Sequence, residues 1–426
     1  MAPEPRTFNR WVIAAMGTLL MLCLGTVYSW SFFQDLLVRG YGAVFGWSNS
    51  QVAWIFSLAI FFLGATAAWG GRQLSRFGPR RMAMIGAALF AAGYALSSVA
   101  LALRSLPLLY LGYGVIGGIG LGLGYVTPVA TVARWFPDRR GLATGMVIMG
   151  FGLGALFMSK VLAPLFIGLT GSAGLAPVFL LLAAVFLVLG TGSAAFMINP
   201  PAAKTGAPAA AGTGPTGAGK AVFSGRFALL WLVFFCNITA GISIISFQSP
   251  LLQGLLGKAD PSLTAAALAG AGATLIAISS IFNGAGRFFW GTVSDRIGRA
   301  RTFRIMLGSQ IVAFFLLAVI GNPWLFAVLA CWVLLCYGGG FGTMPSFIGD
   351  VFGPGLMAAV YGAVLTAWSA GGIVGPQIVA VLKDRISERA STYSFIASGC
   401  FLAAGFVLAL FLSNGPRRAG PRKAGR

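Results

Sequence analysis

Long, nearly uninterrupted runs of apolar residues dominate the chain, and the polar residues gather between them. Residues 11–33, 51–69 and 227–247 are three such runs. About 20 apolar residues wound as a helix cross a hydrocarbon layer of roughly 30 Å, and a helix satisfies its own backbone hydrogen bonds in lipid. The pattern therefore predicts membrane-spanning helices. The first run is too long to be the apolar part of a signal peptide and is interpreted as helix 1.

Twelve helices are predicted in this way, six in each half of the chain. The first six lie near residues 11–36, 50–72, 82–102, 106–132, 140–167 and 175–197. The second six lie near 226–255, 264–292, 303–320, 323–348, 356–381 and 391–413. The predicted fold is all-α, with two pseudo-symmetric six-helix bundles.

The segment between the two sets is rich in Ala, Gly, Pro and Thr. Such a segment buries too little apolar surface to offset the entropy lost on ordering. We therefore expect four parts: an N-terminal bundle (1–199), a flexible linker (200–225), a C-terminal bundle (226–414) and a basic tail (415–426).

Composition and charge support a membrane protein and give its orientation. The chain is 58% hydrophobic and 9% charged, whereas soluble domains carry about 25% charged residues. With the N-terminus inside, cytoplasmic segments hold 21 of the 29 Lys and Arg residues and the opposite loops hold seven. This bias follows the positive-inside rule with both termini cytoplasmic. The net charge of +21 then reflects topology and attraction to anionic lipid, and its scatter over alternate loops argues against a nucleic-acid partner.

The residue types argue against an enzyme. The chain has no histidine, and its five cysteines lie in apolar runs without metal-ligand spacing. Hydrolytic triads thus lack their usual base, and we expect no catalytic residue, metal or cofactor. Glycine runs at 114–124 and 150–154 lie inside apolar helices, where they predict close helix packing and not a phosphate-binding loop.

A repeated motif links the two halves. Residues 71–81 read GRQLSRFGPRR after the second predicted helix, and residues 291–301 read GTVSDRIGRAR after the eighth. A second correspondence joins Tyr125–Phe136 to Phe341–Phe352. Parallel repeats of this kind are typical of secondary transporters that work by alternating access.

The loop motif resembles the hallmark of the major facilitator superfamily, with Ser75 where the family usually has Asp. Tyr28–Trp30, Arg134–Gly145 and Phe282–Gly291 also resemble the bacterial oxalate/formate antiporters and the monocarboxylate transporters, including bacterial lactate–proton symporters. The resemblance implies a secondary transporter in a bacterial inner membrane.

Arg287 is the first candidate binding residue. It precedes Asp295 by eight residues, or about 12 Å along a helix, which places it near the middle of the membrane. No Asp or Glu lies deep in a predicted helix to pair with it. A substrate carboxylate matches its bidentate guanidinium, and the family resemblance implies the same role. Asn283, one turn earlier, shares its face.

The oxalate antiporters pair that Arg with a Lys in helix 11, and Trp368 stands at the resembling position here. One cation suits one carboxylate, because a second carboxylate left unpaired in a dry pocket carries a large desolvation cost. The sequence therefore favours monocarboxylates. The remaining cavity-lining positions implied by the resemblance are aromatic: Tyr28, Tyr125, Phe151, Tyr337 and Phe341.

The coupling and gating residues are the last predictions. Asp35 and Asp260, near outer helix ends, are candidate proton sites, and solvated loop-end charges are the alternative. Asp295 is expected to hold the cytoplasmic side closed by pairing with Arg134 and Arg139, and Arg76 belongs to the same gate.

We thus expect a secondary active transporter of small monocarboxylates of the lactate and pyruvate class. Proton symport by alternating access is the expected mechanism, and an oxalate/formate-type anion antiporter is the alternative. The expected partners are a small carboxylate, protons and membrane lipid, with the protein acting as a monomer.

Overall fold

The computed structural model describes residues 9–136, 140–171, 174–201, 215–319, 321–353, 356–386 and 389–414. Within these ranges the ordered elements are helical, and twelve of the helices are long and apolar enough to cross a membrane. The chain is therefore a multi-pass membrane protein. Each predicted helix overlaps one of the twelve spans.

The N-terminal half contains six spans, some of them built from several helical pieces. In chain order the spans are α1 (Arg10–Gly25) with η1 (Thr26–Ser29), α2 (Trp30–Leu37), η2 (Val38–Gly42) and α3 (Ala43–Phe45); α4 (Asn49–Phe77); α5 (Pro79–Ala102); α6 (Leu106–Leu109) with η3 (Tyr110–Gly117) and α7 (Gly118–Trp135); α8 (Arg140–Phe157) with η4 (Met158–Leu162) and α9 (Ala163–Thr170); and α10 (Leu175–Val185) with η6 (Phe186–Gly190) and α11 (Thr191–Ala194).

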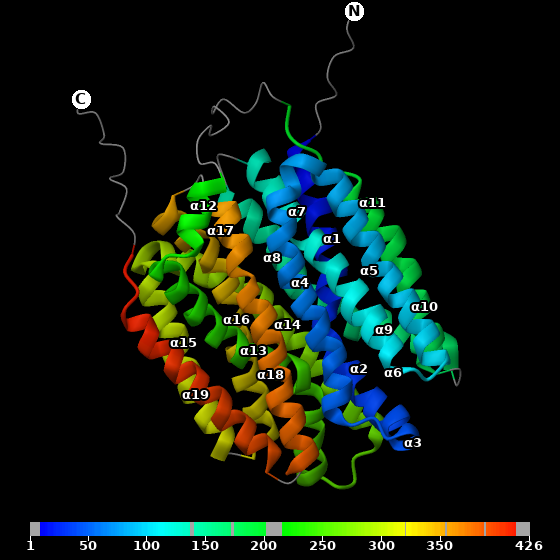
Figure 1. Ribbon diagram of the computed structural model, residues 1–426. Coiled ribbons are helices and arrows are strands. Elements are labelled where there is room, and N and C mark those ends of the chain that lie inside the picture. Colours follow the sequence, from blue (N-terminus) through cyan, green and yellow to red (C-terminus); the bar gives the residue numbers. More distant parts are fainter. Residues whose placement is uncertain are drawn as a thin grey trace, which may run out of the picture.

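The C-terminal half contains the other six spans. They are α13 (Gly225–Ala259), α14 (Ala265–Ile297), α15 (Arg299–Val319), α16 (Pro323–Phe352), α17 (Met357–Val364) with α18 (Thr366–Arg385), and α19 (Ala390–Leu410). The two halves stand side by side in Figure 1, with α14 and α8 in contact and α18 and α4 in contact across the interface. The predicted pair of six-helix bundles is confirmed.

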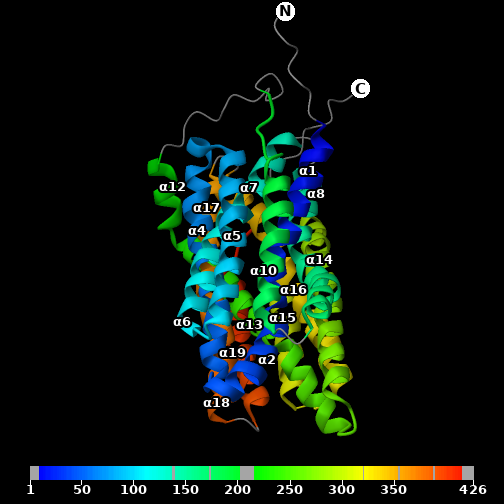
Figure 2. The same ribbon diagram turned by 90° about the vertical axis from the view of Figure 1, so that its right-hand side faces the viewer.

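Both described ends of the chain lie on the same face of the bundle. Helix α1 begins there and α19 ends there, as Figures 1 and 2 show. We call this the terminal face, and we call the opposite one, where α4 begins and α18 ends, the distal face. An even number of spans requires this arrangement.

Two elements differ from the predictions. The first span continues to Phe45 because η2 and α3 extend it as far as Gly46, whose φ of 70° ends the helix. The linker predicted to be flexible contains a helix, α12 (Pro215–Val222). It begins at a proline, which suits the first turn of a helix, and it packs against α17 and α13.

The predicted helix packing at the glycine runs is confirmed. A Cβ atom added to Gly154 would lie 2.2 Å from the carbonyl carbon of Gly25, and one added to Gly122 would lie 2.4 Å from the carbonyl oxygen of Leu63. Backbones approach this closely only where the side chain is a hydrogen atom.

Candidate functional site

Arg287 lies on α14 in the middle of the interface between the two halves. Its side chain is 2% exposed, and it is the charged residue among the buried polar side chains of the described chain. None of its three guanidinium nitrogens has a hydrogen-bond partner within the described residues. The guanidinium carbon lies 5.6 Å from the ring centre of Phe151 and 5.1 Å from that of Phe341. The protein thus surrounds a cation with rings and leaves its hydrogen-bond donors unused.

Glycines on α16 hold this part of α14 in place. A Cβ atom at Gly338 would lie 2.1 Å from the carbonyl oxygen of Asn283, and one at Gly342 would lie 2.0 Å from that of Arg287. Helices α14 and α16 therefore cross with their backbones in contact beside both predicted binding residues. Asn283 is buried, and its side-chain oxygen has no partner among the described residues.

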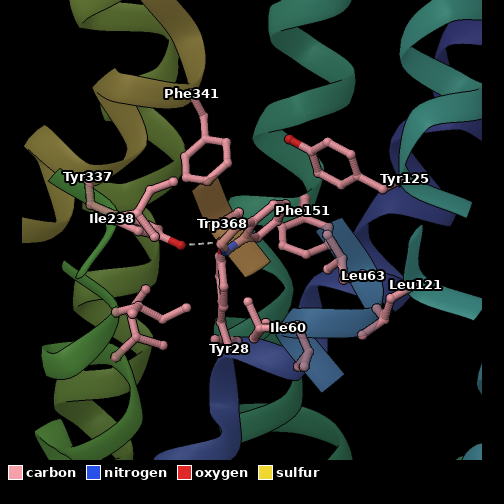
Figure 3. Packing of buried hydrophobic residues seen from close by; sticks show 14 of the residues in the cluster. Tyr28, Ile60, Leu63, Leu121, Tyr125, Phe151, Ile238, Tyr337, Phe341 and Trp368 are labelled. Carbon is pink, nitrogen blue, oxygen red and sulfur yellow. Dashed lines mark hydrogen bonds between the residues drawn. The ribbon is translucent and has the colours of Figure 1, made fainter. Parts of the chain in front are cut away.

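Trp368 is the centre of an aromatic cluster formed by both halves. Its ring centre lies 6.2, 5.3, 5.7 and 4.6 Å from those of Tyr28, Tyr125, Phe151 and Phe341. Figure 3 shows Trp368, from α18, lying between the rings of the two bundles. The indole packs against Phe151 and Phe341, the two rings that contact Arg287.

A hydrogen bond between tyrosines closes the cluster. The hydroxyl oxygens of Tyr28, from η1, and Tyr337, from α16, are 2.7 Å apart, as the dashed line in Figure 3 marks. All eight predicted binding residues are thus buried together around Arg287 at the interface of the two halves. Their roles in binding remain predictions.

A narrow space lies next to Tyr28 and Asn283, between the two halves. It has no room for a water molecule, and Gln248 and Ser279 are among its other lining residues. The Ser279 hydroxyl donates to the Gln248 side-chain oxygen at 2.8 Å. A substrate therefore needs a change in the packing of the halves before it can enter.

Sequence reasoning missed several members of this site. Tyr361 is buried, interacts electrostatically with Arg287 and lies beside Tyr125. It precedes Trp368 by seven residues, a spacing that places two residues on one helix face, so a signal was present. Gln248 and Ser279 gave a weaker signal, as isolated polar residues within apolar runs.

Ser280 joins the halves by entering the hydrogen-bond ladder of α8. Its hydroxyl donates to the Gly152 carbonyl at 2.6 Å and accepts from the Leu156 N–H at 3.1 Å. In an uninterrupted α-helix those two backbone groups would bond to each other. Gly284 lies one turn after Ser280 on α14, and a Cβ atom added to Gly152 would lie 2.7 Å from its Cα. Helices α8 and α14 are therefore in backbone contact beside the site.

The two proton-site candidates have different surroundings. The Asp35 side chain is 12% exposed and forms an ion pair with Arg39 at 2.9 Å. Asp260 is exposed and accepts hydrogen bonds from the hydroxyl and N–H of Ser262 at 2.6 and 3.0 Å. These bonds hold the pKa of Asp260 below its ordinary value. Asp260 therefore stays ionised at physiological pH.

The predicted gate pair of Asp295 and Arg134 is absent from the described conformation. Asp295 pairs with Arg299 at 2.5 Å, one turn farther along the chain, and Arg299 also reaches Asp350 at 3.2 Å. Arg134 donates to Asn199 at 3.0 Å within its own half. The physical reason is proximity: the turn at Gly298 brings Arg299 next to Asp295.

The contact described for Arg76 lies within its own half. The guanidinium carbon of Arg76 lies 5.6 Å from the ring centre of its neighbour Phe77. Arg139 lies outside the described residues.

The fold and the site define a class: a two-bundle helical membrane transporter that buries a cation between its halves, without a hydrogen-bond partner among the described residues. We call the cluster of buried residues around this cation the chamber. The sequence matches the profile of the Major Facilitator Superfamily over residues 8–376. The chain belongs to this superfamily, whose members are transporters and not enzymes.

Curated relatives cover nearly the whole chain. It is 29% identical to the oxalate:formate antiporter of Oxalobacter formigenes, over 97% of this chain and 94% of that protein. It is 26% identical to apicoplast pyruvate carrier 1 of Toxoplasma gondii, over 90% and 85%. It is 28% identical to monocarboxylate transporter 11 of Mus musculus, over 85% and 80%.

Among solved structures, a D-xylose-proton symporter superposes with a TM-score of 0.72 at 17% identity, over 95% of this chain and 98% of that chain. At this identity the likeness concerns the fold alone.

Proposed function

We propose that the protein is a secondary carrier of small monocarboxylates of the lactate and pyruvate class, and that Arg287 binds the substrate carboxylate. The observation that carries this proposal is the buried guanidinium without a hydrogen-bond partner among the described residues. A carboxylate accepts two parallel hydrogen bonds from such a group and neutralises its charge. Relatives named for monocarboxylates and pyruvate agree with this choice of substrate.

The number of charges in the chamber favours one carboxylate. The rings of Phe151 and Phe341 contact the guanidinium, and the ring of Trp368 packs against both of them. A dicarboxylate would place its second charge against these rings with no cation to meet it, at a desolvation cost of several kcal/mol. Exchange of oxalate for formate is the second candidate, because the oxalate:formate antiporter is similar over nearly its full length.

The proposed mechanism is alternating access coupled to protons in a bacterial inner membrane, with the terminal face in the cytoplasm and the protein acting as a monomer. Asp35 is the proposed proton site. What supports it over Asp260 is its burial and its position beside Arg39, which also contacts Gln253 of the other half at 3.1 Å. A proton there would release Arg39 and loosen a contact between the halves.

Uptake by the purified protein in liposomes tests the function. Radiolabelled lactate, formate, acetate and oxalate are offered with and without an inward proton gradient, and again after loading with unlabelled anion. We expect saturable lactate uptake that the proton gradient accelerates and that oxalate inhibits weakly. Uptake of oxalate that depends on internal formate, with no effect of the gradient, would support the antiporter. No saturable uptake of any of the four anions would contradict both.

A further inference from the structure

The carboxylate of Asp384 joins the two halves at the distal face. Asp384 lies at the end of α18 in the C-terminal half, and its partners begin α4 in the N-terminal half. One carboxylate oxygen accepts from the backbone N–H of Asn49 at 3.0 Å and from its side-chain N–H at 3.1 Å. The other accepts from the backbone N–H of Ser50 at 2.8 Å.

These bonds complete the start of α4. The first N–H groups of a helix have no partners within the helix. Ser48 is the N-cap of α4 and accepts from the N–H of Gln51 at 3.2 Å. The N–H groups of Asn49 and Ser50 remain, and the carboxylate from the opposite half takes both. A negative charge at this position also interacts favourably with the helix dipole.

Other polar contacts cross between the halves at the same end. Gln377, two turns before Asp384 on α18, donates to the Ser50 carbonyl at 3.4 Å. Lys160 donates to the Thr274 hydroxyl at 2.7 Å. These contacts join α4 to α18 and the end of η4 to α14, so the distal ends of both bundles are tied together.

We infer that Asp384 is the lock of the distal gate: it holds this face closed when it caps α4 and must release α4 whenever the face opens. This inference rests on the alternating access proposed above and names the contact that controls it. Asp384 is itself exposed, so water can take over its hydrogen bonds and those of α4 after opening. Charge-assisted bonds at an exposed helix end are moderate in strength, which suits a lock that must open in each cycle.

The variants Asp384→Asn and Asn49→Pro test the lock from its two sides. Asparagine has one acceptor oxygen in place of two and loses the charge. Proline at position 49 removes both donors of that residue but suits the first position of a helix. Proline at position 49 is also compatible with Ser48, because the residue before a proline favours an extended backbone and Ser48 already has one, with φ −75° and ψ 163°.

The measurement is the distance between spin labels on the purified full chain without substrate. The labels are placed at Val44 and Ala266, exposed positions on the distal ends of the two halves, after replacement of the native cysteines. We expect each variant to raise the ratio of long to short distances about fivefold, which corresponds to about 1 kcal/mol. The double variant should add little to the larger single effect, because both changes break the same contact.

Asp260→Asn is the matched control, since that exposed carboxylate bonds to Ser262 within its own half. It should leave the distances unchanged. If Asp384→Asn does not fold, the distances measured in Asn49→Pro test the lock alone. A distance distribution equal to that of the parent in a folded variant of either kind would overturn the lock. Because no substrate is present, this result is independent of whether the proposed carboxylate is transported.

Discussion

At the scale of single residues, the central fact is a buried guanidinium that has no hydrogen-bond partner among the described residues. A charged side chain at this depth costs roughly 2.5–3.5 kcal/mol on insertion scales. The rings of Phe151 and Phe341 recover part of that cost through cation–π contact, worth about 2 kcal/mol when desolvated. An anion bound to Arg287 would offset the remaining cost. In the proposed function, Arg287 meets the substrate carboxylate when the chamber opens.

In the proposed function, Trp368 limits the chamber to one carboxylate. We predict that Trp368→Lys shifts transport toward dicarboxylates, because a second cation would then meet the second carboxylate. The measurement is inhibition of lactate uptake by oxalate. Trp368→Phe, which keeps a ring without a charge, is the control and should retain the preference for lactate. Oxalate competing as well as lactate in the unmodified protein would refute this assignment.

The two outer aspartates predict different responses to pH. Since the Ser262 hydrogen bonds lower the pKa of Asp260, this carboxylate is charged throughout the range from pH 5 to pH 8. Any folding stability that these bonds provide is fully present at pH 5 and above. It is lost only at lower pH, as the pH falls through the lowered pKa of Asp260. Asp260→Asn should thus leave the pH profile of uptake unchanged.

Asp35→Asn should flatten the same profile if Asp35 is the coupling site. Uptake rates at several pH values compare the two variants directly. A flattened profile in Asp260→Asn with a normal one in Asp35→Asn would reverse the assignment.

Most of the site was predictable from sequence because a charge, a polar residue or an aromatic residue stands out in an apolar helix. Arg287 had no carboxylate to pair with, and the family resemblance supplied the aromatic positions. Tyr361 was missed because a single tyrosine in a membrane helix is ordinarily a packing or interface residue. The pairing of Asp295 with Arg299 was not foreseen, because it depends on the turn that brings a cation of the same half next to this carboxylate.

At the scale of elements, the crossing of α14 and α16 fixes the binding residues. The backbone of α16 at Gly338 and Gly342 contacts the backbone of α14 at Asn283 and Arg287. The two side chains therefore extend from a rigidly packed part of the helix. A site built on packed helices holds its geometry better than one built on loops.

We predict that Gly342→Ala abolishes lactate binding and lowers the melting temperature. Its Cβ atom would lie 2.0 Å from the Arg287 carbonyl oxygen, and backbone cannot move aside cheaply. Gly291→Ala is the matched control, because its nearest neighbour would be 3.6 Å away, an ordinary contact. That change should be neutral or slightly stabilising, since Ala favours helix by about 1 kcal/mol over Gly. Equal behaviour of the two variants in thermal unfolding would contradict this view of the crossing.

Apolar run length predicted the existence and order of the spans, but not their interruptions. The break between α17 and α18 at Leu365 depends on local backbone geometry, which run length does not record. Helix α12 was also invisible to the pattern, because its composition is that of a linker and its packing against α17 is tertiary.

At the scale of the whole molecule, polar contacts tie the two halves together at the distal face, and the narrow space beside Tyr28 and Asn283 has no room for water. The predicted pair of Asp295 and Arg134 belongs to the opposite face. It stays a prediction for the conformation in which that face is closed. The two faces would then be held by different kinds of contact, a helix cap at one and an ion pair at the other.

The central claim is that Arg287 binds the substrate, and equilibrium binding tests it most directly. Lactate affinity is measured by calorimetry on the purified protein, on Arg287→Gln, and on Arg301→Gln, an exposed arginine of α15, as control. Loss of hydrogen bonds to a charged group costs about 1.5–3 kcal/mol, so we expect Arg287→Gln to weaken binding by roughly tenfold to 150-fold while Arg301→Gln binds normally. Normal affinity in folded Arg287→Gln would contradict the account.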